Sequence, residues 1–564
     1  MSEFLFYYEK VNPVSWAYLS SLLLIGLFFK FNRFWSVRNL DLILLILLAP
    51  GLLLVTAGLR QATDAAKQIA ALQKVQVDPA TGESAAAIEA AGAASAVIGD
   101  EEAAELEDLL ADDQTTAPEE TAEPADAAAD APGDAASRSP DTPLPEEAPP
   151  VLDAASEEPT LGAELKKWQD LKADSLRMAF QGYLWLFVVC ALLLVRLLFD
   201  PTMVRRPLLE PNLSSGGLLF IGIALFVFLM ANVVTSDVTV SDLQGAKGAQ
   251  AILDRTDHSR SDQQVEDYSQ FGPGHYALHL LPRIMTTPFA KNGHSADPQM
   301  TTQIVVAKTM AILAHLAVVV AMVLIGYLHF ENIKMGIGAA TMYLMLPYTA
   351  HMTGHVYHVL PAALLLWAIV LYRRPAAAGV LIGLAMSVFY YPFFLLPLWL
   401  SFYWQRGVMR FASGLLVAVG VMVLTLVFVS GDVNSFVQKV IPMFGFWWPK
   451  TAAEQLEGIW GLGWEPVYRL PVIVMCGVIA FSLILWPAQK NLGTLLSCTA
   501  AVMIAVQFWH AHGDGGGMYM AWFLPLTLLT VFRPNLEDRV ALSVLGEDWF
   551  TRRRARLAQL QKAA

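Results

Sequence analysis

Histidines are unevenly spread along this chain of 564 residues, and their positions are the first indication of chemistry. Nine of the eleven fall in loops, or at ends of apolar segments, that the charge pattern assigns to one side of a membrane. These nine are His258, His275, His279, His294, His351, His355, His358, His510 and His512. Only His315 and His329 lie elsewhere. Because imidazole titrates near neutral pH and binds metals, the pattern predicts one chemically equipped face.

His351, His355 and His358 have the i, i+4, i+7 spacing that places three imidazoles along one face of a helix. A carboxylate or a water molecule could complete a zinc site on such a face. Gly354 interrupts the run, which favours instead a cleft lined by hydrogen-bonded histidines. The sequence therefore requires no cofactor, and a divalent metal held by these three residues is the alternative.

Two other pairs of histidines are candidates for the wall of a substrate cleft. His275 and His279 again have i, i+4 spacing, and His510 and His512 precede a glycine-rich stretch that predicts a flexible loop. The second pair either meets the substrate or belongs to a solvent-exposed turn. All four join His355 and His358 as predicted cleft residues.

Two carboxylates follow the apolar segment 215–233 directly. Asp237 and Asp242 are predicted to lie just above the membrane, where partial loss of water suits a general base that takes a proton from a hydroxyl group. An Asp after a membrane span is also a common helix cap, so a structural role is the alternative.

The elements that must position these residues are membrane-spanning helices. The chain is 55% hydrophobic and only 15% charged, with a mean hydropathy of +0.47, whereas soluble domains carry about 25% charged residues. This composition excludes an ordinary cytosolic enzyme and a nucleic-acid-binding protein. About thirteen apolar segments predict an all-α, polytopic transmembrane bundle. They centre on 14–30, 40–58, 179–199, 215–233, 304–328, 335–350, 359–372, 377–390, 392–404, 411–430, 470–486, 492–509 and 519–532.

Basic residues in the short loops predict the orientation. Lys and Arg recur after alternate segments and again in the tail. This pattern predicts a multi-pass protein of the cytoplasmic membrane, with its N-terminus outside and its C-terminus in the cytoplasm. Basic clusters at both ends of 377–404 predict two short helices that meet on the outer side, at Tyr390, Tyr391 and Pro392. Tyr391 is therefore a further predicted cleft residue.

An acidic insert interrupts the apolar body. Residues 61–180 hold 27 Asp and Glu but only 7 Lys and Arg, and the Ala-, Glu- and Pro-rich middle predicts a largely disordered extracytoplasmic segment over 59–178 with helical flanks. It separates a two-span hairpin at 1–58 from a transmembrane core at 179–535 and a basic cytoplasmic tail at 536–564. The three cysteines lie inside apolar runs, so neither a disulfide nor a zinc knuckle is indicated.

Several short motifs appear in a recognisable order between about 215 and 535. They are Asp242-Leu243 with Gly248-Ala249, Phe271-Gly272-Pro273 at the start of an apolar helix, and Gly379 through Ala385 followed by Pro392. In this order the chain resembles the GT-C superfamily of integral-membrane glycosyltransferases, and most of all the mannosyltransferase-like branch that uses polyprenyl-phosphate sugars. A Lys often precedes that Pro in the branch, whereas Phe389, Tyr390 and Tyr391 stand here.

The resemblance implies transfer of a sugar from a lipid-linked donor to a membrane or cell-envelope acceptor. Asp242, or else Asp237, would be the general base, and Arg283, Lys308 or Arg469 would bind the donor phosphate in place of the Lys. Lys308 lies near the outer end of its span, where a charge marks a functional site unless it only reaches the interface. The alternatives are a non-catalytic membrane scaffold and a transporter, although no convincing internal repeat favours the latter.

Overall fold

The computed structural model describes residues 13–76, 161–203, 209–254, 271–290, 298–444, 456–510 and 519–534, and within these ranges the chain is all-helical, without a β-strand. The N-terminal half contains α2 (Pro13–Phe28), α3 (Val37–Gln76), α6 (Leu161–Phe199), α7 (Ser215–Thr235), α8 (Val240–Asp254), α10 (Pro273–Ala290) and α11 (Pro298–Leu328). Then follow α12 (Ile333–Met345), α13 (Pro347–His351), α14 (Val356–Val370), α15 (Pro375–Val388), η3 (Tyr391–Leu395), α16 (Leu396–Tyr403) and α17 (Val408–Val429). The chain continues with α18 (Val433–Met443), α19 (Ile459–Leu462), α20 (Arg469–Ser482), α21 (Leu492–Gln507), η6 (Met520–Trp522) and α22 (Leu524–Phe532), with further 3-10 turns at Phe31–Arg33, Asp200–Thr202 and Pro466–Tyr468.

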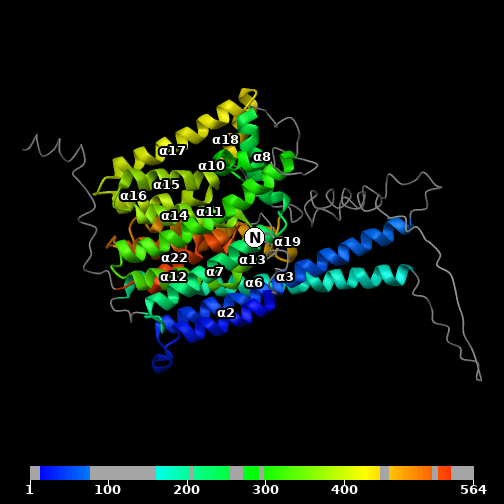
Figure 1. Ribbon diagram of the computed structural model, residues 1–564, viewed down its shortest axis with the longest axis horizontal. Helices are drawn as coiled ribbons and strands as arrows, with labels where there is room; N and C mark the ends of the chain where they lie inside the picture. The colour runs from blue at the N-terminus through cyan, green and yellow to red at the C-terminus, as the bar shows by residue number, and fades with distance from the viewer. Residues whose placement is uncertain are drawn as a thin grey trace, which may run out of the picture. The chain divides into compact units, whose positions relative to one another are not determined.

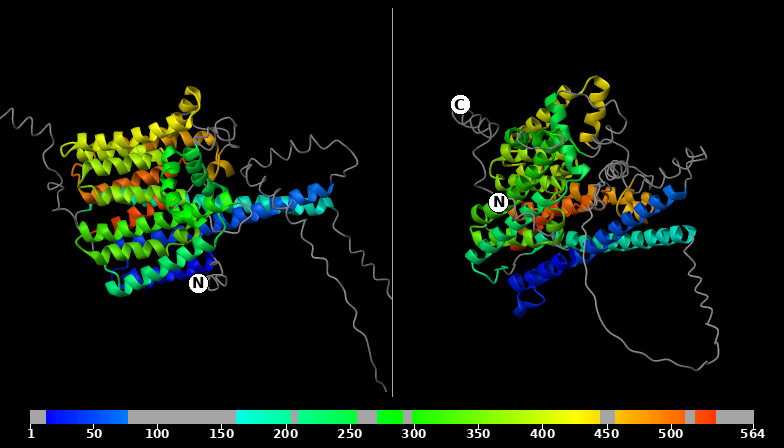
Figure 2. Two further views of the ribbon diagram at one scale, coloured as in Figure 1. Left: turned by 45° about the horizontal axis from the view of Figure 1, so that its top comes forward. Right: turned by 45° about the vertical axis from the view of Figure 1, so that its right-hand side comes forward.

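Every one of the thirteen predicted apolar segments contains helix. Among the described residues, five helical stretches are long and apolar enough to cross a membrane: Val37–Gln73, Gly162–Thr202, Ser215–Thr235, Met300–Leu328 and Val408–Val427. Six apolar helices are shorter, so the structure supports a multi-pass membrane protein but does not establish thirteen crossings. Helices such as α11, α14, α15 and α17 lie side by side (Figures 1 and 2).

The chain divides into two compact units, Met1–Ala62 with Ala173–Ala564, and Thr63–Lys172. The second unit falls within the predicted insert. The described parts of this unit are helical: α3 continues to Gln76 and α6 begins at Leu161. The flanks of the insert were predicted to be helical. The acidic middle of the insert and the basic tail lie outside the described residues.

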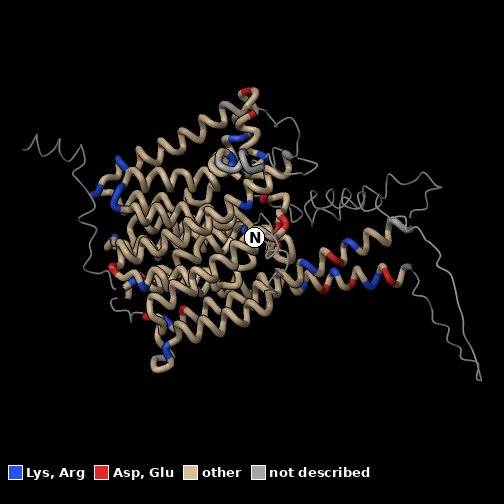
Figure 3. Tube along the Cα trace, in the orientation of Figure 1, with Lys and Arg blue, Asp and Glu red and all other residues tan. Residues whose placement is uncertain are grey.

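Helices α15 and α16 form the predicted hairpin. The chain turns at Phe389 and Tyr390, and the Tyr403 hydroxyl at the end of α16 donates to the Tyr372 carbonyl just before α15 at 2.6 Å. This bond brings the two flanking basic clusters to one end of the bundle. Lys and Arg indeed gather there, around the ends of α16 and α17 (Figure 3), and we call this the basic end.

Glycines allow α15 and α17 to approach closely. A Cβ on Gly379 would lie 2.1 Å from the Phe411 carbonyl oxygen, and one on Gly414 would lie 2.1 Å from that of Ala376. Small residues permit such close backbone contact between membrane helices. The glycine-rich run at Gly379, part of the resemblance to glycosyltransferases, therefore has a packing role in this structure.

Buried ion pairs tie the N-terminal hairpin to the C-terminal helix at the basic end. Arg196 on α6 bonds both carboxylate oxygens of Asp41 on α3, at 2.7 and 3.0 Å, and reaches Asp200 at 3.0 Å. The second oxygen of Asp200 accepts from Arg533 at 2.5 Å, and Arg38 donates to the Arg533 carbonyl at 2.9 Å. Four of these side chains are almost fully buried, which makes their mutual neutralisation essential.

Candidate functional site

Asp242 forms a buried pair with His355 at the other end of the bundle. It lies in the first turn of α8, where the Thr239 hydroxyl donates to its Oδ2 at 2.7 Å. His355 Nδ1 approaches Oδ1 at 3.2 Å and Oδ2 at 3.1 Å from the N-cap of α14. The side chain of Asp242 is 4% exposed and that of His355 is 20% exposed. The carboxylate is therefore oriented from two sides and largely shielded from water.

Helix α10 packs His279 and Tyr276 against α8. A Cβ on Gly245 would lie 2.4 Å from the His279 ring, and one on Gly248 would lie 2.1 Å from the Tyr276 ring, so both glycines leave room for α10. His279 Nδ1 donates to the His275 carbonyl at 2.7 Å, and the two imidazoles lie 4.6 Å apart. Burial lowers the pKa of His279 to about 4, opposed in part by that carbonyl bond and by the Asp242 carboxylate, so this histidine is neutral at pH 7. Helix α10 is not a candidate span.

A second set of contacts surrounds Tyr391, where η3 begins. His510 Nδ1 lies 2.6 Å from the Tyr391 hydroxyl, and the two rings meet edge to face. Arg469 at the start of α20 donates from Nε to the Trp509 carbonyl at 2.7 Å and lies over the Trp509 ring. Trp509 also packs against Tyr391 at 5.1 Å. A buried cation thus stands beside two residues of the predicted cleft.

Ring contacts join these two sets. His358 lies 5.6 Å from His355 and 4.4 Å from Tyr519, whose ring is 4.6 Å from His510. The Tyr348 hydroxyl holds His358 Nδ1 at 2.5 Å. We call the connected side chains the histidine cluster: Asp242, His275, His279, His355, His358, Tyr519, His510, Tyr391 and Arg469. It combines a carboxylate, several imidazoles and one guanidinium group, and these groups together suit proton transfer next to a bound anion.

Two predicted site residues, Lys308 and Arg283, make other contacts in the described part of the chain, and a third, Asp237, is exposed. Lys308 donates to the Val234 carbonyl in the last turn of α7 at 2.9 Å, which is the contact of a helix C-cap. Arg283 donates to the Gln250 side chain at 3.3 Å, and Asp237 is exposed in the link between α7 and α8. Three cations were candidates for binding the donor phosphate. Arg469 belongs to the histidine cluster as defined above, whereas Lys308 and Arg283 make the contacts just described.

The spacing of His351, His355 and His358 does not produce three ligands on one helix face. Helix α13 ends at His351 and α14 begins only at Val356, because the chain turns through Gly354 between them. Within the described ranges, no group of three or more His, Cys, Asp and Glu side chains is placed to hold a metal ion. His512 lies outside the described residues.

Sequence reasoning missed Thr239, Tyr348 and Tyr519, which contact the predicted residues. Thr239 could have been found, since a Thr three residues before Asp242 at a helix start commonly shares its hydrogen bonds. Nothing in the local sequence of Tyr519 indicates its place between His358 and His510.

Comparison with known proteins adds no family to this geometry. No family model matches the chain, and a search of curated proteins finds no significant match. The contacts of the histidine cluster are therefore the basis for an assignment of function.

Proposed function

We propose that this protein is an integral-membrane glycosyltransferase of the GT-C type. It moves a sugar from a polyprenyl-phosphate donor to a hydroxyl of a membrane or cell-envelope acceptor, at the outer face of the cytoplasmic membrane. The observation that carries the proposal is the Asp242–His355 pair, connected through aromatic side chains to the buried cation Arg469. Neither a scaffold nor a simple hydrophobic anchor needs a buried carboxylate–imidazole pair connected to a buried cation.

In this mechanism Asp242 removes the proton of the acceptor hydroxyl as its oxygen attacks the anomeric carbon. The bond between that carbon and the lipid phosphate breaks, and the phosphate leaves with the electron pair. Arg469 stabilises the negative charge that develops on the leaving phosphate. His355 and Thr239 hold the carboxylate in place, so that no further conformational entropy is lost in orienting it when the acceptor hydroxyl binds.

The site lies where a lipid-linked donor could reach it. His355 caps the start of helix α14, which ends at Val370, just before Arg373 and Arg374 of the basic end. The histidine cluster and the basic end therefore lie at opposite ends of this helix. If basic loops face the cytoplasm, the histidine cluster faces outward. This topology has the N-terminus outside and the C-terminus in the cytoplasm.

Asp242→Asn tests the assignment. The amide keeps the size of the side chain but cannot act as a base, so transfer of radiolabelled sugar from polyprenyl-phosphate donors to a membrane acceptor extract should fall by about 10²–10⁴-fold at unchanged protein level. The matched control is Asp237→Asn, an exposed Asp five residues earlier, which should retain the parent's rate.

Full activity in Asp242→Asn would reject this residue as the base. Loss of activity in Asp237→Asn alone would move the base to that position. A parent protein that transfers no sugar from any donor, but whose reconstituted vesicles exchange a solute, would instead support the transporter.

A further inference from the structure

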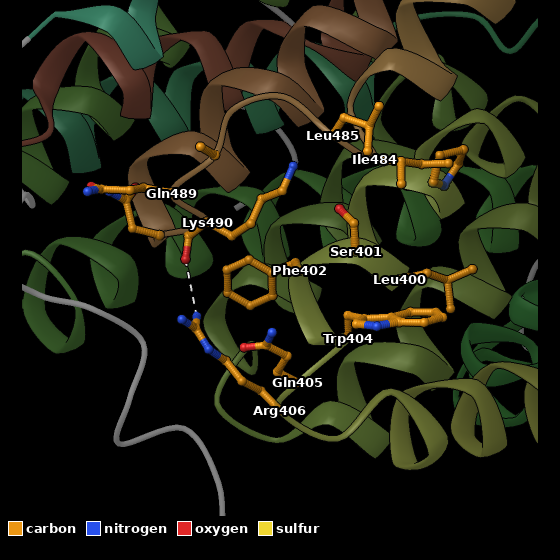
Figure 4. Close-up of a pocket in the computed structure, with 13 residues that line it drawn as sticks. Leu400, Ser401, Phe402, Trp404, Gln405, Arg406, Ile484, Leu485, Gln489 and Lys490 are labelled. Carbon is orange, nitrogen blue, oxygen red and sulfur yellow. Dashed lines mark hydrogen bonds between the residues drawn. The ribbon is translucent and has the colours of Figure 1, made fainter.

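A pocket of about 720 Å³ lies at the basic end, at the opposite end of the bundle from the histidine cluster. It opens between the end of α16 with the turn that follows and the connection from α20 to α21 (Figure 4). Its walls include Leu400, Phe402, Trp404, Arg406, Leu485 and Lys490. The volume is in the range of about 300–1,000 Å³ that small-molecule sites occupy.

Two cations line this pocket. Arg406 Nη1 donates to the Lys490 carbonyl at 3.1 Å, and Lys490 Nζ donates to the Leu483 and Trp486 carbonyls at 2.6 and 3.1 Å. Within the part of the chain that the structure describes, neither side chain pairs with a carboxylate, and the pocket has no acidic lining residue. Among the described residues, no carboxylate therefore offsets the positive charge of the pocket, and the amides of Gln405, Gln489 and Asn491 lie around it.

The rim of the same pocket is apolar and exposed. Trp404 is 71% exposed and Leu485 is 84% exposed, and Leu400 and Ile484 continue this surface along the pocket (Figure 4). A small soluble anion would neutralise the cations but would leave these side chains uncovered. A ligand that carries both an anionic group and hydrocarbon chains covers both.

We propose that this pocket binds the headgroup of an anionic phospholipid in the leaflet at the basic end. The phosphate lies between Arg406 and Lys490, and the acyl chains lie along Trp404 and Leu485. Basic pockets between membrane helices on the cytoplasmic side bind such headgroups, and a guanidinium group matches a phosphate in geometry as well as in charge. The inference does not depend on the proposed glycosyltransferase activity, because it concerns the opposite end of α14.

The test is lipid binding to the purified full-length protein in mixed micelles, followed by native mass spectrometry. Phosphatidylglycerol should bind at least about tenfold more tightly than phosphatidylcholine, and Arg406→Gln should weaken it about fivefold. Lys490→Gln should add a similar factor, but this Lys also binds the last carbonyls of α20, so Arg406→Gln is the decisive variant. Arg374→Gln removes an exposed cation outside the pocket and is the matched control.

Trp404→Ser with Leu485→Ser separates a lipid from a free anion. These changes should weaken phosphatidylglycerol several-fold and leave any competition by glycerol 3-phosphate unchanged. Equal binding of both lipids, or an equal effect of Arg374→Gln and Arg406→Gln, would overturn the site. Binding of inorganic phosphate as tight as that of phosphatidylglycerol would overturn the lipid as its occupant.

Discussion

The two ends of the helix bundle differ in the partners of their buried carboxylates. At the basic end, Asp41 and Asp200 are buried and bound by the guanidinium groups of Arg196 and Arg533. At the other end the buried carboxylate of Asp242 has a histidine and a threonine hydroxyl as its partners. One end therefore pairs its carboxylates with permanently charged guanidinium groups, whereas at the other end the partners of the carboxylate are an imidazole and a hydroxyl group.

This difference separates a structural role from a chemical one. An arginine stays protonated at any physiological pH, so the Arg196–Asp41 pair fixes helices but cannot exchange protons. An imidazole beside a carboxylate orients it by a hydrogen bond and does not place a permanent positive charge next to it. We therefore expect substitutions at the basic end to affect folding, and substitutions in the histidine cluster to affect activity.

The largest effect concerns which end faces outward. The three native cysteines are buried, so they should react little with a membrane-impermeant maleimide. A thiol introduced as Asp237→Cys should react in intact cells, whereas one introduced as Arg374→Cys should react only after the membrane is opened, because both positions are exposed but lie at opposite ends. Reaction of Arg374→Cys in intact cells would invert the topology and contradict an extracytoplasmic active site.

Breaking the ion pairs should have the next largest effect. Arg196→Met leaves Asp41 buried without its main partner, and such a change costs about 3–5 kcal/mol of stability. We expect a clear fall in the thermal unfolding midpoint in detergent and a loss of folded protein. Arg177→Met is the control, since Arg177 and its partner Asp174 are both largely exposed on the same helix. Equal midpoints for the two variants would show that the buried pairs do not anchor the helices.

Hydropathy located the helices in advance because an apolar run is a local property of the sequence. Asp242 and Arg469 were also candidates from the sequence, since charges beside apolar segments are conspicuous. His355 was a candidate too, but as a metal ligand or cleft residue, because its contact with Asp242 spans 113 positions and depends on tertiary packing. The i, i+4, i+7 spacing of the three histidines does not fall on one helix, because the turn at Gly354, which the sequence already indicated, separates α13 from α14. Lys308 was conspicuous as an intramembrane charge, yet it caps α7.

His355 should affect the rate of transfer more than the stability, because Asp242 keeps the Thr239 hydroxyl as a partner when His355 is replaced. His355→Phe removes the Nδ1 contact and should lower kcat by about 100-fold with little change in KM, because in the proposed mechanism the residue acts by positioning Asp242. His355→Asn keeps a donor near the position of Nδ1 and should restore most of the rate. A residue needed only for packing would give the same loss in both variants, together with a lower unfolding midpoint.

The smallest expected change in stability and transfer rate comes from replacing glycines by alanine, and two helical glycines allow a comparison. Gly245→Ala places a methyl group 2.4 Å from the His279 ring, and overpacking of this kind costs about 1–3 kcal/mol, offset by roughly 1 kcal/mol of improved helix propensity. The net result should be a loss of about 1 kcal/mol and a reduced transfer rate, because His279 must move away from its place near Asp242. Gly420→Ala on α17 is the matched control, since a Cβ there meets nothing within 4 Å, and it should gain up to about 1 kcal/mol from helix propensity alone. Unfolding midpoints and transfer rates of both variants provide the comparison. If Gly245→Ala gained stability as Gly420→Ala does, the close packing of α8 on α10 would be wrong, and with it the arrangement of His279 near Asp242.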